Sequence, residues 1–291
     1  MSNYHYLITG LPALSLDDSK KTYTVAEFKA EAEPMLSSGD RKIMRWIFYL
    51  YDNQNLLAYL KKKPDWSFDE RGVYAKETIA EICHLLQTEG RVPSGIPTPN
   101  YFPCFIRNFY ARLEETEHPE SNDLLEDTLS ALYYEEAMCC RNAFLSSWFE
   151  LNLNIRNVML SVACRKYGLE KNDYIIGKNA MAESLRLWGG RDLVVNNAPD
   201  YLPELLQITE EPDLLVRERK TDALRWKWLE EKTFYKTFDF ESVITYLLRL
   251  EMLDRWIGMD KALGEQTFRR LVTDMKRESA DTLEEFKDNN K

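Results

Sequence analysis

The sequence is short of the residues and motifs on which most catalytic centres depend. It contains three histidines among 291 residues, so histidine-based acid–base catalysis has little to draw on. The phosphate-binding pattern GxxxxGK followed by Ser or Thr, the dinucleotide pattern GxGxxG and the nucleophile pattern GxSxG do not occur. These absences predict a protein that is not an enzyme and that carries no cofactor.

The cysteines do not follow the spacing of a zinc site or of a disulfide framework either. Zinc sites need pairs such as CxxC or CxxxxC, and no such pair occurs. The number of cysteines is odd and their spacing is irregular, which is typical of buried free thiols in a reducing cytosol. Two of them are adjacent in a segment that we expect to be helical. The cysteines are Cys83, Cys104, Cys139, Cys140 and Cys164.

Long apolar runs and an excess of basic residues are also missing. The longest clear apolar run, residues 46–51, is far shorter than the roughly 18 residues that a membrane span needs. The first residues lack a basic segment and a long apolar segment, so we expect no signal peptide. The formal net charge of -10 argues against nucleic acid as the main partner, because phosphate binding needs a clustered basic surface. We expect a cytoplasmic protein that is at most peripheral to a membrane.

Proline and glycine are both absent between Pro119 and Gly168. Apolar residues in this stretch recur at three- and four-residue steps, which is the helical period. An unbroken helix over residues 120–167 would span about 70 Å. The sequence therefore predicts an elongated bundle around one very long central helix. We expect a bend at Ser146–Ser147 or within residues 152–157, where Ser and Asn side chains compete for backbone hydrogen bonds.

The remaining chain shows helical periodicity without alternating strands and helices, so the predicted fold class is all-α. Thr24 and Glu27 form a capping-box pattern. Residues 4–12 fit a short strand or an extended arm, and the proline-rich residues 91–103 fit an extended strap. We expect two lobes, 1–119 and 120–291, or one continuous domain. The other predicted helices cover residues 25–36, 37–60, 73–86, 101–115, 177–188, 200–207, 212–234, 240–257 and 264–277.

Two tryptophans are placed unusually on one of these helices. Trp226 and Trp228 stand two residues apart, so they cannot both face the same core. We expect one of them to face a partner or another element, because exposed tryptophan is typical of an interface.

One arrangement favours a different function, a helical-bundle metalloenzyme. The pattern ExxH occurs at Glu81–His84 and at Glu115–His118, and two such motifs in a four-helix bundle build a di-iron carboxylate site. The second motif is followed directly by a proline, a position that disfavours helix, so we do not favour this interpretation. A generic helical scaffold for an unrelated partner is a third hypothesis. The further carboxylates of such a metal site would be Glu135, Glu136 and Glu150.

A loose repeat places polar residues inside apolar helix faces. Asp52 and Asn55 precede a Leu-Leu pair, and Glu150 and Asn154 precede an isoleucine in a second helix. A third helix, residues 240–256, carries an acidic and a basic residue in a similar setting. A buried Asn or acid must find a partner on a neighbouring helix, which would hold each helix pair in register. We therefore predict packing roles for Asp52, Asn55, Asn154, Glu251 and Arg255.

Three segments carry a family resemblance: YHYLITGLPAL at residues 4–14, DNQNLLAYL at residues 52–60 and YLLRLEMLDRW at residues 246–256. With these segments the chain resembles the C subunit of V/A-type ATPases, called d in the eukaryotic V-type enzyme. It is similar, over nearly its whole length, to a shorter bacterial family found with V/A-type ATPase components in Bacteroidetes-like bacteria.

The resemblance implies a non-catalytic role and a fold related to a three-lobed helical funnel. In V/A-type ATPases the C subunit sits on the cytoplasmic end of the membrane rotor ring and receives the central-stalk subunits D and F. It passes torque between them during proton or sodium transport, and it holds neither nucleotide nor metal. For this chain the resemblance therefore implies the rotor ring and the stalk subunits as partners, at the inner face of the cell membrane.

Overall fold

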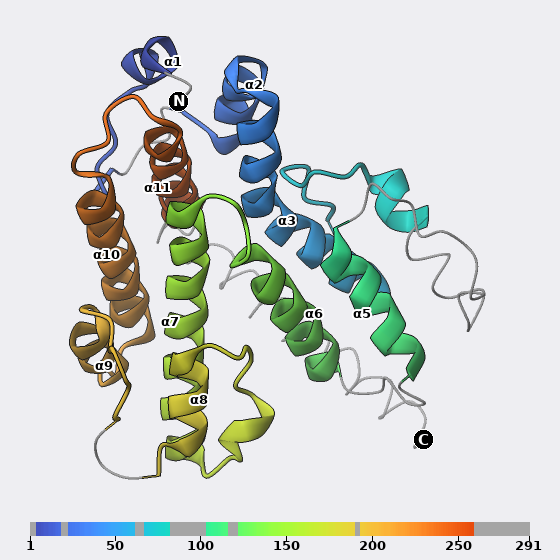
Figure 1. The fold of residues 1–291 in the computed structure, drawn as a ribbon, viewed down its shortest axis with the longest axis vertical. Coiled ribbons are helices and arrows are strands. Elements are labelled where there is room, and N and C mark those ends of the chain that lie inside the picture. The colour runs from blue at the N-terminus through green and yellow to red at the C-terminus, as the bar shows by residue number, and fades with distance from the viewer. Residues whose placement is uncertain are drawn as a thin grey trace, which may run out of the picture.

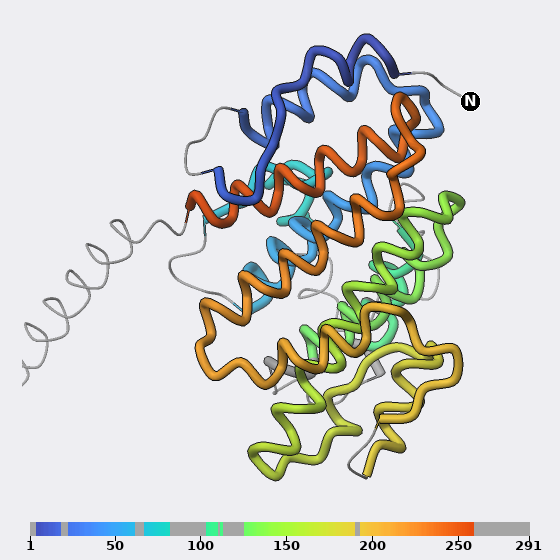
Figure 2. The backbone as a smooth tube through the Cα atoms, turned by 90° about the vertical axis from the view of Figure 1, so that its left-hand side faces the viewer, coloured from blue at the N-terminus to red at the C-terminus, as the bar shows by residue number. Residues whose placement is uncertain are grey.

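The computed structural model describes residues 4–18, 23–61, 67–81, 103–115, 122–189 and 193–258. Throughout these ranges every regular element is a helix and no strand occurs, which confirms the all-α prediction. Figure 1 and Figure 2 show an elongated bundle, and the second view shows its helices inclined to the long axis. Among the helices described, none combines the length and the apolar content that crossing a membrane requires.

Residues 76–81 are helical, and the other helices are α1 (His5–Gly10), α2 (Val25–Met35), α3 (Ser38–Leu60), α5 (Cys104–Glu115), α6 (Asn122–Ala137), α7 (Ala143–Tyr167), the 3₁₀ helix η1 (Lys171–Asp173), α8 (Ala180–Leu187), α9 (Leu202–Thr209), α10 (Leu214–Thr233) and α11 (Phe240–Gly258).

Short polar side chains fix where several helices begin. The predicted capping box is confirmed at α2, where the Thr24 hydroxyl accepts from the Glu27 N–H and the Glu27 carboxylate accepts from the Thr24 N–H. Asp213 caps α10 by accepting from the Val216 N–H. The expectation of a strand or an extended arm at residues 4–12 was wrong, because this segment forms the short helix α1. The Tyr4 N–H donates to the Phe238 carbonyl at 2.8 Å, so a tertiary contact holds its start.

The single long helix predicted over residues 120–167 was wrong. Helix α6 ends at Ala137, α7 begins at Ala143, and the two helices lie side by side (Figure 1). The Asn142 side chain caps α7 by accepting from the Leu145 N–H, and the Ser146 hydroxyl donates to the Met138 carbonyl. These polar contacts close a tight reversal without proline or glycine.

The position of the two adjacent cysteines and the expected bend both depended on the long helix, and both differ in the structure. Cys139 and Cys140 lie in the turn between α6 and α7, not within a helix. Helix α7 continues through Ser146–Ser147 and residues 152–157, where we expected the bend, and the chain reverses before α7 instead. Its Asn154 and Asn157 side chains are buried and bond to other elements instead of competing with the helix.

The buried residues form one cluster that extends from Tyr4 to Leu253. Both tryptophans of α10 belong to it, and the two do not face the same neighbours, as the spacing predicted; the partner of each is another element of this chain. They face different neighbours: Trp228 lies against Phe144 and Trp148, while Trp226 lies under the Arg249 guanidinium of α11. Helix α10 is therefore covered on two sides.

Some predicted features lie outside the described residues. They are the proline-rich strap over most of residues 91–103, the last helix at residues 264–277, and the metal-ligand candidates His84 and His118.

Candidate functional site

The loop after helix α3 is held to this helix by two hydrogen bonds, both made by the buried side-chain amide of Asn55. The Asn55 amide donates to the Asp69 carbonyl and accepts from the Asp69 N–H, both at 2.9 Å. A side-chain amide that binds both backbone groups of one residue fixes that residue in position and in register. Asn55 is 1% exposed, so water cannot take over either bond.

Asp52, one helical turn earlier, holds the same loop at a second point. Its carboxylate accepts from the Val73 N–H at 2.9 and 3.1 Å and from the Tyr74 N–H at 3.1 Å. Burial raises the pKa of Asp52 to about 6, although the backbone donors oppose this shift. A Cβ on Gly72 would lie 2.3 Å from the Asp52 carboxylate, so glycine is required at this close approach.

Helix α7 repeats this arrangement with the loop that follows it. The Asn157 amide donates to the Ile176 carbonyl at 2.7 Å and accepts from the Ile176 N–H at 3.3 Å. Asn154, one turn earlier, accepts from the Asn179 amide at 2.8 Å and donates to the Tyr201 hydroxyl at 2.9 Å. Asn157 is thus the counterpart of Asn55, and Asn154 is the counterpart of Asp52.

The structure shifts the predicted repeat by one helical turn. The sequence pattern paired Asn55 with Asn154, whereas the hydrogen bonds pair Asn55 with Asn157. Asn157 was missed because α7 carries asparagines at 152, 154 and 157, and spacing alone does not tell which one meets a backbone. We call residues 69–74 and 175–179 the two strapped loops.

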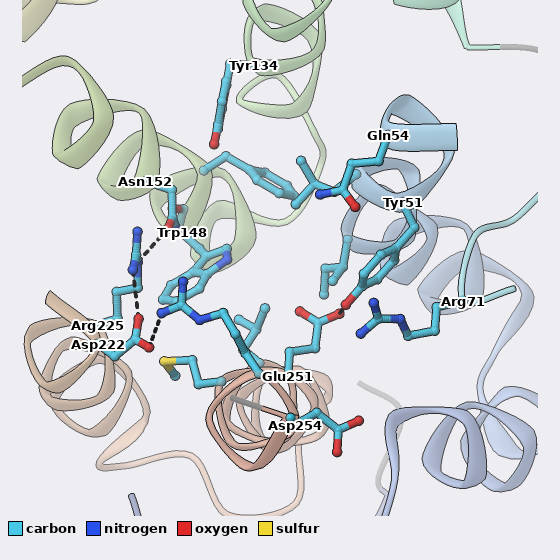
Figure 3. Close-up of a pocket in the computed structure, with 17 residues that line it drawn as sticks. Tyr51, Gln54, Arg71, Tyr134, Trp148, Asn152, Asp222, Arg225, Glu251 and Asp254 are labelled. Carbon is cyan, nitrogen blue, oxygen red and sulfur yellow. Dashed lines mark hydrogen bonds and ion pairs between the residues drawn. The ribbon is translucent and has the colours of Figure 1, made fainter. Parts of the chain in front are cut away.

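A pocket of about 500 Å³ opens between α3, α6, α7, α10 and α11. Figure 3 shows its two polar sides, one around Glu251 and the other around Asp222. Glu251 and Arg255, both predicted from the sequence, line it. The predicted residues Asp52, Asn55 and Asn154 lie outside its lining and hold the loops.

Glu251 joins α11 to α3 at one side of the pocket. The Tyr51 hydroxyl donates to its carboxylate at 2.9 Å, and the Arg71 guanidinium stacks on the Tyr51 ring at 4.2 Å. Burial, together with the charges of Asp254 and Asp69, raises the pKa of Glu251 to about 7, although Tyr51 and Arg71 oppose the shift. This carboxyl group therefore changes charge near neutral pH.

Asp222 is the centre of the other side of the pocket. It is 1% exposed and accepts from Arg225 at 2.8 Å, from Trp256 at 2.7 Å and from Arg255. Arg225 also donates to the Asn152 amide oxygen at 2.9 Å, which links α10 to α7. Removing a partner from a buried carboxylate destabilises a fold, because the carboxylate is left less well paired. Sequence reasoning missed Asp222 because two of its three partners lie on another helix, α11.

The residues considered for a di-iron site have other roles where the structure describes them. Glu136 accepts from the backbone N–H groups of Cys104 and Phe105 and so caps α5. Glu135 pairs with Lys178 on the surface, and Glu150 accepts from Asn179. Among the described residues, no three side chains of His, Cys, Asp or Glu converge as a metal site would require.

Comparison with known proteins gives one result. A family model described as "Protein of unknown function (DUF2764)" matches residues 1–279. No curated protein matches the chain. No solved structure matches it.

Proposed function

The chain belongs to this family of unknown function, and on the basis of its structure we propose a non-catalytic coupling role in the central stalk of a V/A-type rotary ATPase. In this role it joins the membrane rotor ring to the stalk subunits D and F at the inner face of the cell membrane. The proposal combines the sequence resemblance with one structural observation, which is the position of the exposed apolar side chains.

Large apolar side chains are exposed at both ends of the long axis. Helix α1 and the connection between α10 and α11 lie at one end, and the last turns of α7 and α8 lie at the other (Figures 1 and 2). At the first end Tyr6, Phe234 and Tyr235 are 83%, 77% and 92% exposed. At the second end Tyr167 and Leu187 are 70% and 85% exposed. Exposed apolar residues of this size are typical of protein contacts, and a coupling protein needs two such surfaces.

The body between these two ends is built to resist deformation. Helix α10 packs against α9 and α11, and α7 packs against α6, α8 and α9. Close-packed protein interiors transmit strain. The strapped loops tie helix ends to the same body through buried hydrogen bonds. Both features support transfer of torque from one end to the other.

Charged substitutions at each end test the proposal. We expect Tyr235→Asp and Leu187→Asp each to lower ATP-driven ion uptake by membrane vesicles at least about tenfold, because one buried charge at an interface costs more than that factor in affinity. ATP hydrolysis by the detached soluble sector should persist. The matched control is Leu214→Asp, which changes a leucine that is 61% exposed at the start of α10, whereas Tyr235 follows the end of this helix.

Native uptake in all three variants would contradict the proposal. Equal loss in all three would also contradict it, since the contacts would then not be confined to the ends. A helical scaffold for an unrelated protein predicts that ATP-driven uptake does not change when the chain is removed.

A further inference from the structure

The pocket has the size and the walls of a small-ligand site. Its volume of about 500 Å³ falls within the roughly 300–1,000 Å³ of such sites. Tyr51, Trp148 and Phe149 contribute aromatic surface to its walls (Figure 3). Aromatic faces attract cations through the negative potential above the ring.

The arginines that line the pocket are already neutralised. Arg71 donates to both oxygens of Asp69, with distances of 2.5 to 3.2 Å. Arg225 and Arg255 both bind the single carboxylate of Asp222, and Arg255 also lies 3.6 Å from Glu218. An incoming anion would have to compete with these carboxylates. The arginines therefore do not make the pocket an anion site.

Glu251 is in the opposite situation. In the described part of the chain it has one hydrogen bond, from the neutral Tyr51 hydroxyl, and no ion pair. Arg71, whose charge favours the ionised form of Glu251, is held by Asp69, while the charge of Asp254 opposes ionisation. Tyr134 from α6 stays neutral, because burial raises its pKa. An ionised Glu251 thus has no ion-pair partner among the residues that the structure describes.

We infer that this pocket binds an organic cation, an alkylammonium or guanidinium group, which forms an ion pair with Glu251 and lies against the aromatic walls. A cation in this position would pair with Glu251, which has no ion pair among the described residues. The net charge of -10 favours the approach of cations to the chain as a whole. The inference does not depend on the coupling role.

The pH dependence of binding follows from the titration of Glu251. Without ligand its pKa is about 7, and a bound cation favours the ionised form, so binding below this pH releases a proton. We expect the affinity to be highest above pH 7 and to fall by up to about tenfold per pH unit below it.

Calorimetric titration of the full chain tests the inference. The probes are agmatine as a free cation, N-acetyl-arginine amide as a basic side chain, and glutarate as an anion. We expect one or both cations to bind at pH 8, with affinity at least about tenfold weaker in Glu251→Gln, and glutarate not to bind. The tighter cation identifies the source, a small molecule or a partner's side chain. Glu231→Gln removes one charge from an exposed position of α10 and should bind like the native chain.

Two results would overturn the inference. One is that neither cation binds the native chain at pH 8. The other is that a cation binds Glu251→Gln as tightly as the native chain, or with the same pH dependence. Circular dichroism checks that Glu251→Gln folds like the native chain. We expect it to fold, because the carboxamide oxygen can still accept from the Tyr51 hydroxyl.

Discussion

Glu251 links two segments 200 positions apart through one hydrogen bond. Its pKa is raised from 4.5 to about 7. Between these values the folded chain holds a proton that the unfolded chain releases. This contribution to stability is therefore complete below pH 4.5 and is lost as the pH rises to about 7. The pKa of Asp52 is raised from 3.8 to about 6. Its contribution to stability is likewise lost as the pH rises, over this lower pH range.

The substitution Glu251→Gln isolates the first of these groups. The carboxamide keeps an acceptor for Tyr51 and cannot ionise. Relative to the native chain, we expect the free energy of unfolding of the variant to rise by about 2–3 kcal/mol between pH 5 and pH 8. Urea denaturation at both pH values measures this difference. Glu231→Gln is the control, and a difference for Glu251→Gln no larger than that of the control would contradict the assignment.

The five residues predicted from the sequence all contact another segment, yet the sequence did not show which partner each would take. Asp52 and Asn55 bind the backbone of a loop that is close in sequence, whereas Arg255 binds Asp222 on another helix. A polar residue within an apolar helix face predicts that its side chain forms a hydrogen bond with some partner. Its partner depends on how the helices pack, which one sequence does not specify.

At the scale of elements, the strapped loops make a definite stability prediction. Asn55→Leu leaves the Asp69 N–H and carbonyl without partners, so we expect it to destabilise the fold by about 2–4 kcal/mol. Asn157→Leu should lower the stability by a similar amount, because it leaves the Ile176 N–H and carbonyl without their partners. Thermal or urea unfolding measures both values.

Gln54→Leu provides the matched control for these two variants. Gln54 lies on α3 beside Asn55 but is exposed, so its loss should change stability by less than about 0.5 kcal/mol. If Asn55→Leu behaved like Gln54→Leu, the amide would not be holding the loop. A large effect at Asn55 alone would show that the two loops are not equivalent.

Helix positions were predictable where local chemistry decides them. The start of α2 follows from the Thr24 capping box, and apolar periodicity indicates α10 and α11. The reversal between α6 and α7 was not predictable from proline or glycine, because Asn142 and Ser146 close it instead. Helix α1 depends on a contact with Phe238, far along the chain, so its residues alone fit other conformations.

At the scale of the whole molecule, the all-α class was predictable, but the pocket and the two apolar ends were not. The pocket collects side chains from five helices, and its two polar sides form only when α3, α10 and α11 come together (Figure 3). The exposed ends likewise combine residues that are distant in sequence, such as Tyr6 and Tyr235. The relation to a three-lobed funnel stays a prediction.

Affinity purification from native membranes tests the coupling role most directly. A tag on this chain, in a detergent that keeps the rotary ATPase intact, should recover ring and stalk proteins in fixed proportion to the chain. A tag on a stalk protein should recover this chain in return. An intact ATPase that contains none of this chain, purified through its own stalk, would contradict the account.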